Sequence, residues 1–443
     1  MADNIESTGG VSLYDWQTPS KDRLVAGFRA GTSCMVNASA TGTGKTLVAL
    51  QMLKELDRPA LIIAPKSVKS TWRRWAEEMG CSDKLLDVVT PERISRGAST
   101  WWDGAKWHVP AGAIVIADEV HRGASGPESL FTKALALLRA YQVPVLAQSA
   151  TLASSPRQLR AVGFLLGLHS FGKESFTAFC RRYGCTYRDM KLVFENTPRS
   201  LACLRELHTK IADRLVRIRI EEVPDFPESQ LEARLFDLED TATAEINEAY
   251  AEMVKRMAIA RNAVDMRTAL MQARHAVEVK KAPLLASLAL DTVEEGESAV
   301  LFVNFQNTVA ALRELLTGKV PFIEIHGKDG TEEDRNKAIE RFQNNEARVA
   351  VIIAAAGGLG LSAHDVKHER PRKTFITPSY NMSEFVQCLG RTHRSGGTKT
   401  IQTVVLAAGT VEERVYKSIL NKRGNLALLV DDDLAPVEIK ETT

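Results

Sequence analysis

The residues from Ser39 to Thr46 read Ser-Ala-Thr-Gly-Thr-Gly-Lys-Thr, a composition typical of loops that bind phosphate groups. They follow a weak strand pattern at residues 34–38 and precede a helical run of leucines. Glycines let backbone N–H groups converge on phosphate oxygens, and the N-terminus of the next helix adds a positive dipole. In such a loop, Lys45 reaches the terminal phosphates of a nucleotide and the Thr46 hydroxyl holds Mg²⁺. A glycine-rich helix start without a ligand is the alternative, and the strand–loop–helix order favours phosphate. The remaining loop residues expected at the phosphates are Thr41, Gly42, Thr43 and Gly44.

Two carboxylates follow the apolar run Ala113–Ala117, in the sequence Asp118-Glu-Val-His121. Side chains at the carboxyl end of a parallel strand point to the crevice where ligands bind. We therefore expect Asp118 to hold Mg²⁺ through water, and Glu119 to orient and deprotonate an attacking water. A solvated acidic turn is the alternative, which the matched phosphate loop disfavours.

Short apolar runs alternate with longer helical patterns along both halves of the chain. Continuous apolar runs separated by helices are typical of parallel sheets covered on both faces. The sequence therefore predicts an α/β fold with two lobes, each built on a parallel β-sheet. The predicted strands are Ala60–Ala64, Ala113–Ala117 and Val145–Gln148 in the first half, and Ala299–Val303, Phe322–Ile325, Val349–Ile353, Thr374–Ile376 and Ile401–Leu406 in the second.

The region from Ser155 to Ala282 has a mainly helical pattern and few strand candidates, so we expect helical protrusions here. Residues 221–230 contain Pro224 and Pro227, which indicates a linker. A basic stretch precedes it, and both a solvated helical face and a phosphate-facing surface remain open. Residues 431–443 begin with three aspartates and are predicted to form a loose acidic tail. The basic residues are Arg181, Arg182, Arg188, Lys191, Arg199, Arg205, Lys210, Arg214, Arg217 and Arg219.

The composition fits a globular protein with two or three domains. The 443 residues include 44% hydrophobic residues, and 57 Lys and Arg against 55 Asp and Glu give a net charge of +2. This balance does not diagnose a nucleic-acid binder, so any such surface requires local clustering. No signal-peptide pattern or membrane-length apolar run is present, so a cytoplasmic location is expected. The six cysteines fit a reducing compartment, although Cys180, Cys185 and Cys203 leave a metal site open.

From Leu13 to Leu429 the sequence resembles the superfamily-two helicases, and the Swi/Snf branch in particular. The similar segments occur in the order of that family's motifs. They are Leu13–Gln17 (adenine-reading segment), 39–46 (motif I), Leu61–Val68 (Ia), Thr90–Arg93 (Ib), Asp118–His121 (II), Ser149–Thr151 (III), Phe302–Gln306 (IV), Ile325–Lys328 with Arg335, Gly357–Ser362 (V), Gln387–Gly396 (VI) and Thr410–Tyr416 (closing helix).

The resemblance implies two RecA-like lobes with ATP between them. It places lobe one at residues 1–225 with a protrusion at about 155–220, a linker and second protrusion at 226–282, and lobe two at 283–430. It also implies that Gln17 reads adenine, that Gly360 contributes to the ATP site, and that Arg391 and Arg394 act as arginine fingers. His121 and His393 are expected to link neighbouring motifs. The implied nucleic-acid contacts are Lys66, Ser67, Thr90 and Arg93 on lobe one, and Asn304, Gln306 and Lys328 on lobe two.

The implied activity is that of an ATP-dependent translocase on double-stranded DNA, with ATP and Mg²⁺ as cofactors. We expect a monomer without membrane contact, in the cytoplasm of a bacterial or phage-infected cell, associated with the nucleoid. Three departures from the Swi/Snf pattern keep a strand-separating DNA or RNA helicase as the alternative: Thr41-Gly-Thr43, Ser149-Ala-Thr151 and Ser362. An inactive nucleic-acid clamp is the alternative of another class.

Overall fold

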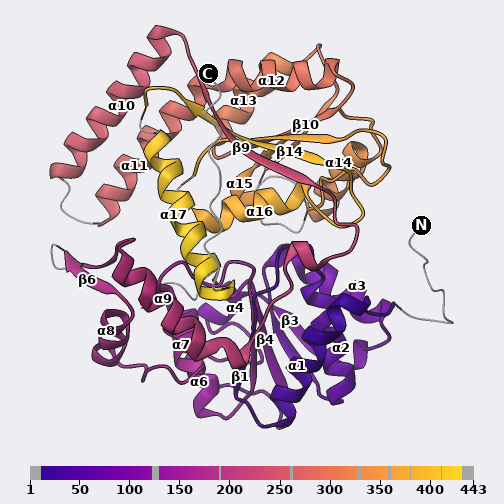
Figure 1. The fold of residues 1–443 in the computed structure, drawn as a ribbon. Helices are drawn as coiled ribbons and strands as arrows, with labels where there is room; N and C mark the ends of the chain where they lie inside the picture. The colour runs from indigo at the N-terminus through magenta and orange to yellow at the C-terminus, as the bar shows by residue number, and fades with distance from the viewer. Residues whose placement is uncertain are drawn as a thin grey trace. The chain divides into compact units, whose positions relative to one another are not determined.

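The computed structural model describes residues 11–121, 129–188, 191–259, 263–326, 331–357, 361–379, 381–410 and 412–431 (Figure 1). The chain divides into two compact units. Unit one comprises Met1–Pro224 with Asn421–Ala435, and unit two comprises Asp225–Leu420 with Pro436–Thr443. Each is considered by itself below.

Unit one is built on a six-stranded parallel sheet in the order β3-β2-β4-β5-β1-β8. Its central strands are continuous apolar runs that are fully buried, as expected for a sheet covered on both faces. Because the strands are parallel, their carboxyl ends share one edge. The strands are β1 (Cys34–Asn37), β2 (Ala60–Ile63), β3 (Leu85–Val89), β4 (Ile114–Asp118), β5 (Val145–Gln148) and β8 (Leu215–Val216).

Helices connect the parallel strands of unit one, as crossover connections require. The α-helices are α1 (Thr18–Arg29), α2 (Lys45–Leu56), α3 (Lys69–Glu78), α4 (Pro91–Ser95), α6 (Leu130–Ala140), α7 (Arg160–Leu165), α8 (Lys173–Arg182) and α9 (Pro198–Ile211). The 3₁₀ turns are η1 (Asp15–Gln17), η2 (Lys66–Val68), η3 (Ser82–Lys84), η4 (Pro156–Gln158), η5 (Ala212–Arg214) and η6 (Ile220–Glu222).

The protrusion between residues 155 and 220 is mainly helical, and it also contains two short strands that were not predicted. Strands β6 (Cys185–Arg188) and β7 (Lys191–Phe194) form an antiparallel pair between α8 and α9. Each strand is only four residues long and mostly solvent-accessible, so neither produces the buried apolar run on which the prediction relied. Strands β3 and β8 were also not predicted.

Unit two has a second six-stranded parallel sheet, in the order β11-β12-β10-β13-β14-β9. All five strands predicted here from the sequence are present. Two parallel sheets with intervening helices confirm the predicted α/β class with two RecA-like lobes. The strands are β9 (Ser229–Phe236), β10 (Ser298–Val303), β11 (Phe322–Ile325), β12 (Val349–Ile353), β13 (Arg372–Ile376) and β14 (Thr400–Ala407).

Strand β9 corrects the prediction that a linker extends from residue 221 to 230 and continues into helices. The strand pairs with β14 over eight residues, from Ser229 to Phe236, and forms the edge of the sheet (Figure 1). Its neighbouring prolines suggested a linker, and its mixed polar and apolar sequence lacks the apolar run of a central strand. The edge position explains this composition, because an edge strand is partly solvated.

The helices of unit two are α10 (Asp240–Ile259), α11 (Ala263–Lys280), α12 (Ala282–Glu294), α13 (Gln306–Leu316), α14 (Glu332–Gln343), α15 (Ala354–Gly357) and α16 (Met382–Thr392). Helix α17 (Glu412–Asp431) begins in unit two, and its last eleven residues belong to unit one. Asp431, predicted to begin the acidic tail, is instead the last residue of α17 and pairs with Arg217 at 2.8 Å. The predicted tail beyond Asp431 lies outside the described residues.

A fully apolar core supports the sheet of unit two. Ala299, Leu301 and Val303 of β10 pack with Val349 and other residues of β12 and α12–α13, and all are buried. A smaller cluster seats α10 and α11 against the end of β14 through Ile246, Tyr250, Val277 and Ala407. Within the described ranges, no helix combines the length and the apolar character needed to cross a bilayer.

Candidate nucleotide and nucleic-acid sites

The phosphate loop lies between the carboxyl end of β1 and the N-terminus of α2. Asn37, the last residue of β1, accepts a hydrogen bond from the Ser39 N–H at 3.1 Å and so fixes the start of the loop. Gly44 precedes α2 with φ of 78°. The positive φ favours glycine here, and a Cβ atom at this position would displace the Gln17 amide from its hydrogen bond to the Thr43 carbonyl.

Lys45 is the first residue of α2, and its ammonium lies within the loop. Its Nζ donates to the carbonyl oxygens of Ser39 at 3.0 Å and Ala40 at 3.1 Å. The Lys45 carbonyl in turn accepts from Nε2 of Gln148 at 3.1 Å. The Lys45 ammonium therefore lies inside the loop, and Asn37 at the end of β1 and Gln148 at the end of β5 bind the loop through hydrogen bonds. Of the other predicted loop residues, Gly42 is exposed, Thr41 and Thr46 are half-buried, and Thr43 is buried.

Gln17 lies beneath the phosphate loop, although the resemblance assigns it to adenine. It is 1% exposed, its Nε2 donates to the Thr43 carbonyl at 3.0 Å, and its Oε1 accepts from the Tyr14 N–H at 3.1 Å. Both ends of the amide are thus bonded within the chain. In this structure Gln17 supports the loop, and the adenine assignment remains a prediction.

The carboxylate pair lies at the carboxyl end of β4. Asp118 accepts hydrogen bonds from Trp72 Nε1 and from the Glu119 N–H, both at 3.0 Å. Glu119 has φ of 50°, in the left-handed region that a side chain with a Cβ rarely occupies. Such backbone strain is typical of functional sites, where the surrounding structure holds a residue in place. The strain therefore supports the sequence-based role of Glu119.

Burial and the neighbouring Glu119 carboxylate raise the pKa of Asp118 to about 6, against the opposing effects of Trp72 and Lys45. The folded state therefore binds this proton more tightly than the unfolded chain, in which an aspartate titrates near 4. The stabilising effect of the bound proton is present below pH 4 and is lost as the pH rises through about 6. A cation bound at Asp118 would offset the loss of folding stability that the charged carboxylate causes at neutral pH.

Replacing Trp72 with phenylalanine should raise the pKa of Asp118 above about 6, because the indole hydrogen bond favours the charged carboxylate. We expect the acidic limb of the pH–ATPase profile to move up by about one pH unit, the size of a hydrogen bond to a charged group. Trp107→Phe is the matched control, since Trp107 is also buried and donates to the Ala134 carbonyl at 2.8 Å. Equal shifts in both variants would contradict the assignment.

His121 links the carboxylate pair to the segment after β5. Its Nδ1 lies 2.7 Å from Ser149 Oγ, 3.2 Å from Thr151 Oγ1 and 3.3 Å from a Glu119 carboxylate oxygen. The structure thus joins motif II to motif III through one imidazole, in the linking role expected from the sequence. In unit two, His393 Nε2 lies 2.6 Å from the Pro227 carbonyl, and its ring packs edge-on against Phe226.

Two further residues of the site were missed from the sequence. Asn37 and Gln148 end the adjacent strands β1 and β5, and both are fully buried beside the phosphate loop. Asn37 Nδ2 and Gln148 Oε1 each lack a hydrogen-bond partner within the described residues. A polar residue that ends an otherwise apolar strand is the sequence signal that could have identified both.

The nucleic-acid candidates of unit one lie on the neighbouring strand ends. Lys66 opens η2 after β2 and is exposed, whereas Thr90 follows β3, is buried and caps α4 by accepting from the Arg93 N–H at 3.3 Å. Arg93 is exposed. Ser67 lies in η2, and its side chain is outside the described residues. The structure thus places these residues at β2 and β3, and the phosphate loop and carboxylates at β1 and β4.

The predicted arginine fingers of unit two bind the segment of motif V. Arg391 is buried in α16, and its Nη1 donates to the Leu361 carbonyl at 3.1 Å. Arg394 Nη1 donates to Ser362 Oγ at 2.6 Å, and its Nε donates to the Gly390 carbonyl at 2.9 Å. The structure therefore brings motifs V and VI together. Gly360 lies outside the described residues.

The nucleic-acid candidates of unit two differ in exposure. Gln306 opens α13 and is exposed, whereas the amide of Asn304 is half-buried and bonded to Glu278 and Thr377. The Asn304 amide is therefore already used within the chain. Lys328 lies outside the described residues.

The basic stretch of the protrusion is partly neutralised. Arg182 pairs with Glu206 at 3.4 Å and Arg188 pairs with Glu195 at 3.3 Å, whereas Arg199, Arg205 and Lys210 of α9 are also exposed. Within the described ranges no three His, Cys, Asp or Glu residues gather as a metal site would require, and this includes the surroundings of Cys180 and Cys185. The basic stretch thus presents both ion pairs and exposed cations to solvent.

Comparison with known proteins shows what the chain resembles. Residues 280–396 match the family model described as Helicase conserved C-terminal domain. A protein of Acanthamoeba polyphaga mimivirus named "Putative ATP-dependent RNA helicase" is 27% identical over 90% of the chain and 80% of its own length. The SWI/SNF-related matrix-associated actin-dependent regulator of chromatin subfamily A-like protein 1 of Xenopus tropicalis is 25% identical over 99% of the chain and 47% of its own length. The human DNA annealing helicase and endonuclease ZRANB3 is 23% identical over 92% of the chain and 39% of its own length.

The chain thus spans less than half the length of the two vertebrate relatives. The matches nevertheless extend over nine-tenths or more of the chain and so include both parallel sheets. Residues 280–396 thus match a helicase C-terminal domain, and nine-tenths or more of the chain is similar to proteins named as helicases or as SWI/SNF-related regulators.

Proposed function

We propose that this protein is a nucleic-acid-stimulated ATPase that moves along double-stranded DNA. One observation carries the proposal: in unit one the Lys45 ammonium lies within a glycine-containing phosphate loop, and its charge acts on the pKa of Asp118. Lys45 follows β1 and Asp118 ends β4, the two strands on either side of β5. A cation and a carboxylate so placed suit a magnesium nucleotide, because the cation binds phosphate oxygens and the carboxylate holds Mg²⁺. The relatives named as ATP-dependent or SWI/SNF-related proteins support the assignment.

The proposed cofactors are ATP and Mg²⁺, and the residues present fit both. The hydroxyl of Thr46 and the carboxylate of Asp118 are the hard oxygen ligands that Mg²⁺ prefers. Gly42 and Gly44, with φ of 86° and 78°, leave no Cβ atoms to obstruct the approach of phosphate to the loop backbone. Bound Mg²⁺ would neutralise phosphate charge. Glu119 would orient and deprotonate the attacking water, and Lys45 would hold the β- and γ-phosphates.

Lys45→Ala should lower ATP turnover by about 10²–10³-fold, the cost of removing one electrostatic donor from a preorganised site. The measurement is steady-state phosphate release with saturating nucleic acid. Lys54→Ala is the matched control, because Lys54 lies on the same helix and is exposed. Turnover at the unmodified level in the Lys45 variant would contradict its assignment to the phosphates.

The proposed DNA-binding residues lie at the strand ends beside the ATP site and on unit two. Lys66, Ser67, Thr90 and Arg93 would contact the backbone through unit one, and Gln306, Lys328 and the loop at Asn304 through unit two. Contacts to phosphates carry no base information, as a motor that steps over any sequence requires. The exposed cations of α9 would extend this surface, which makes affinity salt-dependent.

A strand-separating helicase is the second candidate. The relative named an RNA helicase and the residues Ser149-Ala-Thr151 and Ser362 favour it. ATPase rates with duplex DNA, single-stranded DNA and RNA distinguish the two candidates. We expect duplex DNA to stimulate most strongly. Stimulation by RNA alone would overturn the proposed duplex translocase.

An inactive clamp is disfavoured because Lys45, Glu119, Arg391 and Arg394 are all retained. We further propose that the protein acts as a monomer in the cytoplasm of a bacterial or phage-infected cell, associated with the nucleoid. Light scattering of the protein at working concentration tests the monomeric state. A stable dimer under those conditions would exclude it.

A further inference from the structure

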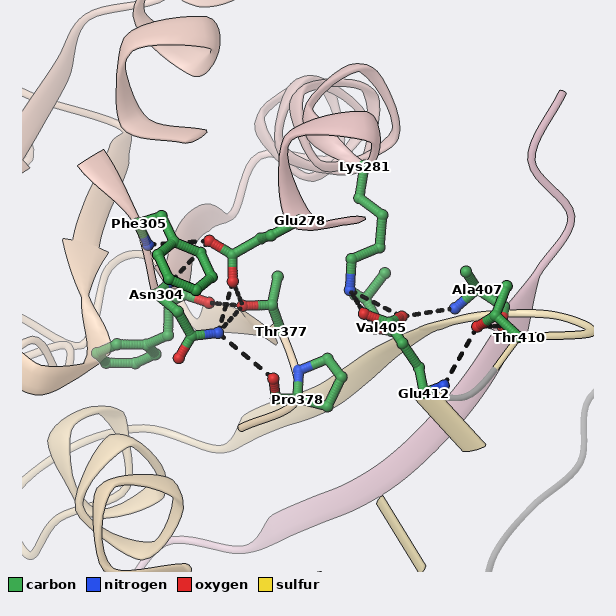
Figure 2. Close-up of polar contacts among 11 residues, drawn as sticks. Glu278, Lys281, Asn304, Phe305, Thr377, Pro378, Val405, Ala407, Thr410 and Glu412 are labelled. Atoms are coloured by element: carbon green, nitrogen blue, oxygen red, sulfur yellow. Dashed lines mark hydrogen bonds and ion pairs between the residues drawn. The ribbon is translucent and has the colours of Figure 1, made fainter. Parts of the chain in front are cut away.

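Glu278 is a buried carboxylate near the end of α11 that binds two strand ends of unit two. It is 3% exposed. Its Oε1 accepts from the backbone N–H groups of Asn304 at 2.7 Å and Phe305 at 3.0 Å. Its Oε2 accepts from Asn304 Nδ2 at 2.5 Å and Thr377 Oγ1 at 2.7 Å. Figure 2 shows the carboxylate pointing from the helix toward these three residues.

These contacts occur where the order of the strands reverses. Asn304 follows β10 and Thr377 follows β13, and these two strands are neighbours in the sheet. The chain leaves β10 in one direction, toward β11, whereas β13 lies on the other side of β10. In open α/β sheets the carboxyl ends at such a point form a crevice for ligands. Here the Glu278 carboxylate accepts hydrogen bonds from the backbone N–H groups of Asn304 and Phe305. These are the donors that an anionic ligand in the crevice would otherwise bind.

The loop that Glu278 holds leads directly into α13. Phe305 is the N-cap of α13 and makes no side-chain capping hydrogen bond of its own, and the exposed Gln306 is the first helical residue. Two other side chains of α11 pack on Phe305. The ring of His275 meets it edge-on at 5.2 Å, and the Arg274 guanidinium lies over it at 5.7 Å. The position of Gln306 therefore depends on α11.

A second buried charge, one turn further along, has different partners. Lys281 is fully buried, and its Nζ donates to the Glu412 carboxylate at 2.7 and 2.9 Å and to the Val405 carbonyl at 3.3 Å. Glu412 also accepts from the Ala407 N–H at 3.0 Å. Figure 2 shows this group separate from the one around Glu278. Lys281 thus anchors the chain to β14 and α17, whereas Glu278 anchors it to the loop at Asn304.

We propose that Glu278 is a positioning residue that couples α11 to the nucleic-acid-binding loop at Asn304–Gln306. The carboxylate fixes the loop backbone, so that Gln306 and the start of α13 face nucleic acid in one orientation. The expected effect of Glu278 on nucleic-acid binding rests on the proposed function. The effect of Glu278 on the loop backbone does not depend on that function. Coupling of this kind typically changes affinity about two- to thirtyfold when one member is replaced.

The test uses Glu278→Gln, which keeps the size of the side chain and replaces one acceptor oxygen with a donor nitrogen. Hydrogen exchange at the Asn304 and Phe305 amides should become about tenfold faster, because their hydrogen bonds to a charged acceptor weaken. The nucleic-acid concentration for half-maximal ATPase stimulation should rise about two- to thirtyfold. Basal ATPase and the KM for ATP should stay within about twofold. Thr377→Val removes the hydroxyl that donates to Glu278 and accepts from Asn304 Nδ2, but it leaves both backbone N–H bonds to Glu278. It should change both readouts in the same direction by less than Glu278→Gln.

Lys281→Met is the matched control, because it removes an equally buried charge from the same stretch of chain. Breaking a buried ion pair is strongly destabilising, so this variant should lower Tm without changing exchange at Asn304 or the half-saturating concentration. The proposal is overturned if exchange in Glu278→Gln is unchanged, or if exchange rises while half-saturation stays constant. If no nucleic acid stimulates the ATPase of the unmodified protein, the proposed function is refuted. The hydrogen-exchange result would still show whether Glu278 fixes the loop.

Discussion

Glu119→Gln is expected to bind ATP with little loss of affinity and to hydrolyse it about 10²–10⁴-fold more slowly, the usual contribution of a general base. The amide is nearly the same size as the carboxylate but cannot accept a proton. The left-handed backbone at Glu119, with φ of 50°, aims this side chain from the end of β4 and should be retained in the variant. Turnover is measured under saturating ATP and nucleic acid, and affinity is measured with a fluorescent ATP analogue.

A second readout separates a direct role of Glu119 from general damage. The Glu119 carboxylate raises the pKa of Asp118, so removing its charge should lower that pKa below about 6. The acidic limb of the residual activity should move to lower pH, opposite to the shift expected for Trp72→Phe. Glu77→Gln, an exposed change on α3, is the control. A Glu119 variant that no longer binds ATP would argue against a role confined to hydrolysis.

Arg394→Ala is expected to lower turnover by about 10³–10⁵-fold while changing ATP affinity far less. A guanidinium that stabilises charge on the transferring phosphoryl group acts mainly in the transition state, and so affects kcat. The structure gives Arg394 a fixed position, since it donates to the Gly390 carbonyl at 2.9 Å and to Ser362 Oγ at 2.6 Å. Comparison of kcat with the KM for ATP tests the role.

Ser362→Ala is the control for this variant. It removes the hydroxyl that accepts from Arg394 but keeps the guanidinium, so it reports the loss of the local contact alone. We expect the fold-decrease in turnover for Ser362→Ala to be less than one tenth of the fold-decrease for Arg394→Ala. Equal losses in the two variants would mean that Arg394 only holds the segment of motif V, and an unchanged rate in Arg394→Ala would remove it from catalysis.

The two-lobe α/β class, most of the strands and the positions of the motifs can be predicted from the amino-acid sequence. Buried parallel strands such as Val145–Gln148 and Val349–Ile353 are short apolar runs, and this local pattern follows directly from burial on both faces. The phosphate loop and the carboxylate pair are equally local, because a few consecutive residues provide the turn, the charge and the helix start. Strand β9 was missed because a partly solvated edge strand lacks that pattern.

The pairing of distant polar groups, in contrast, is visible only in the folded chain. Trp72 reaches Asp118 across 46 residues, Gln17 reaches Thr43 across 26, and Glu278 holds Asn304 across 26. A local pattern reports whether a residue is buried and in which kind of element, but buried polar groups take their partners from whatever packing and strand register bring near. For that reason the sequence could name Asn304 as a candidate for nucleic acid, while only the fold disclosed that Glu278 already holds it.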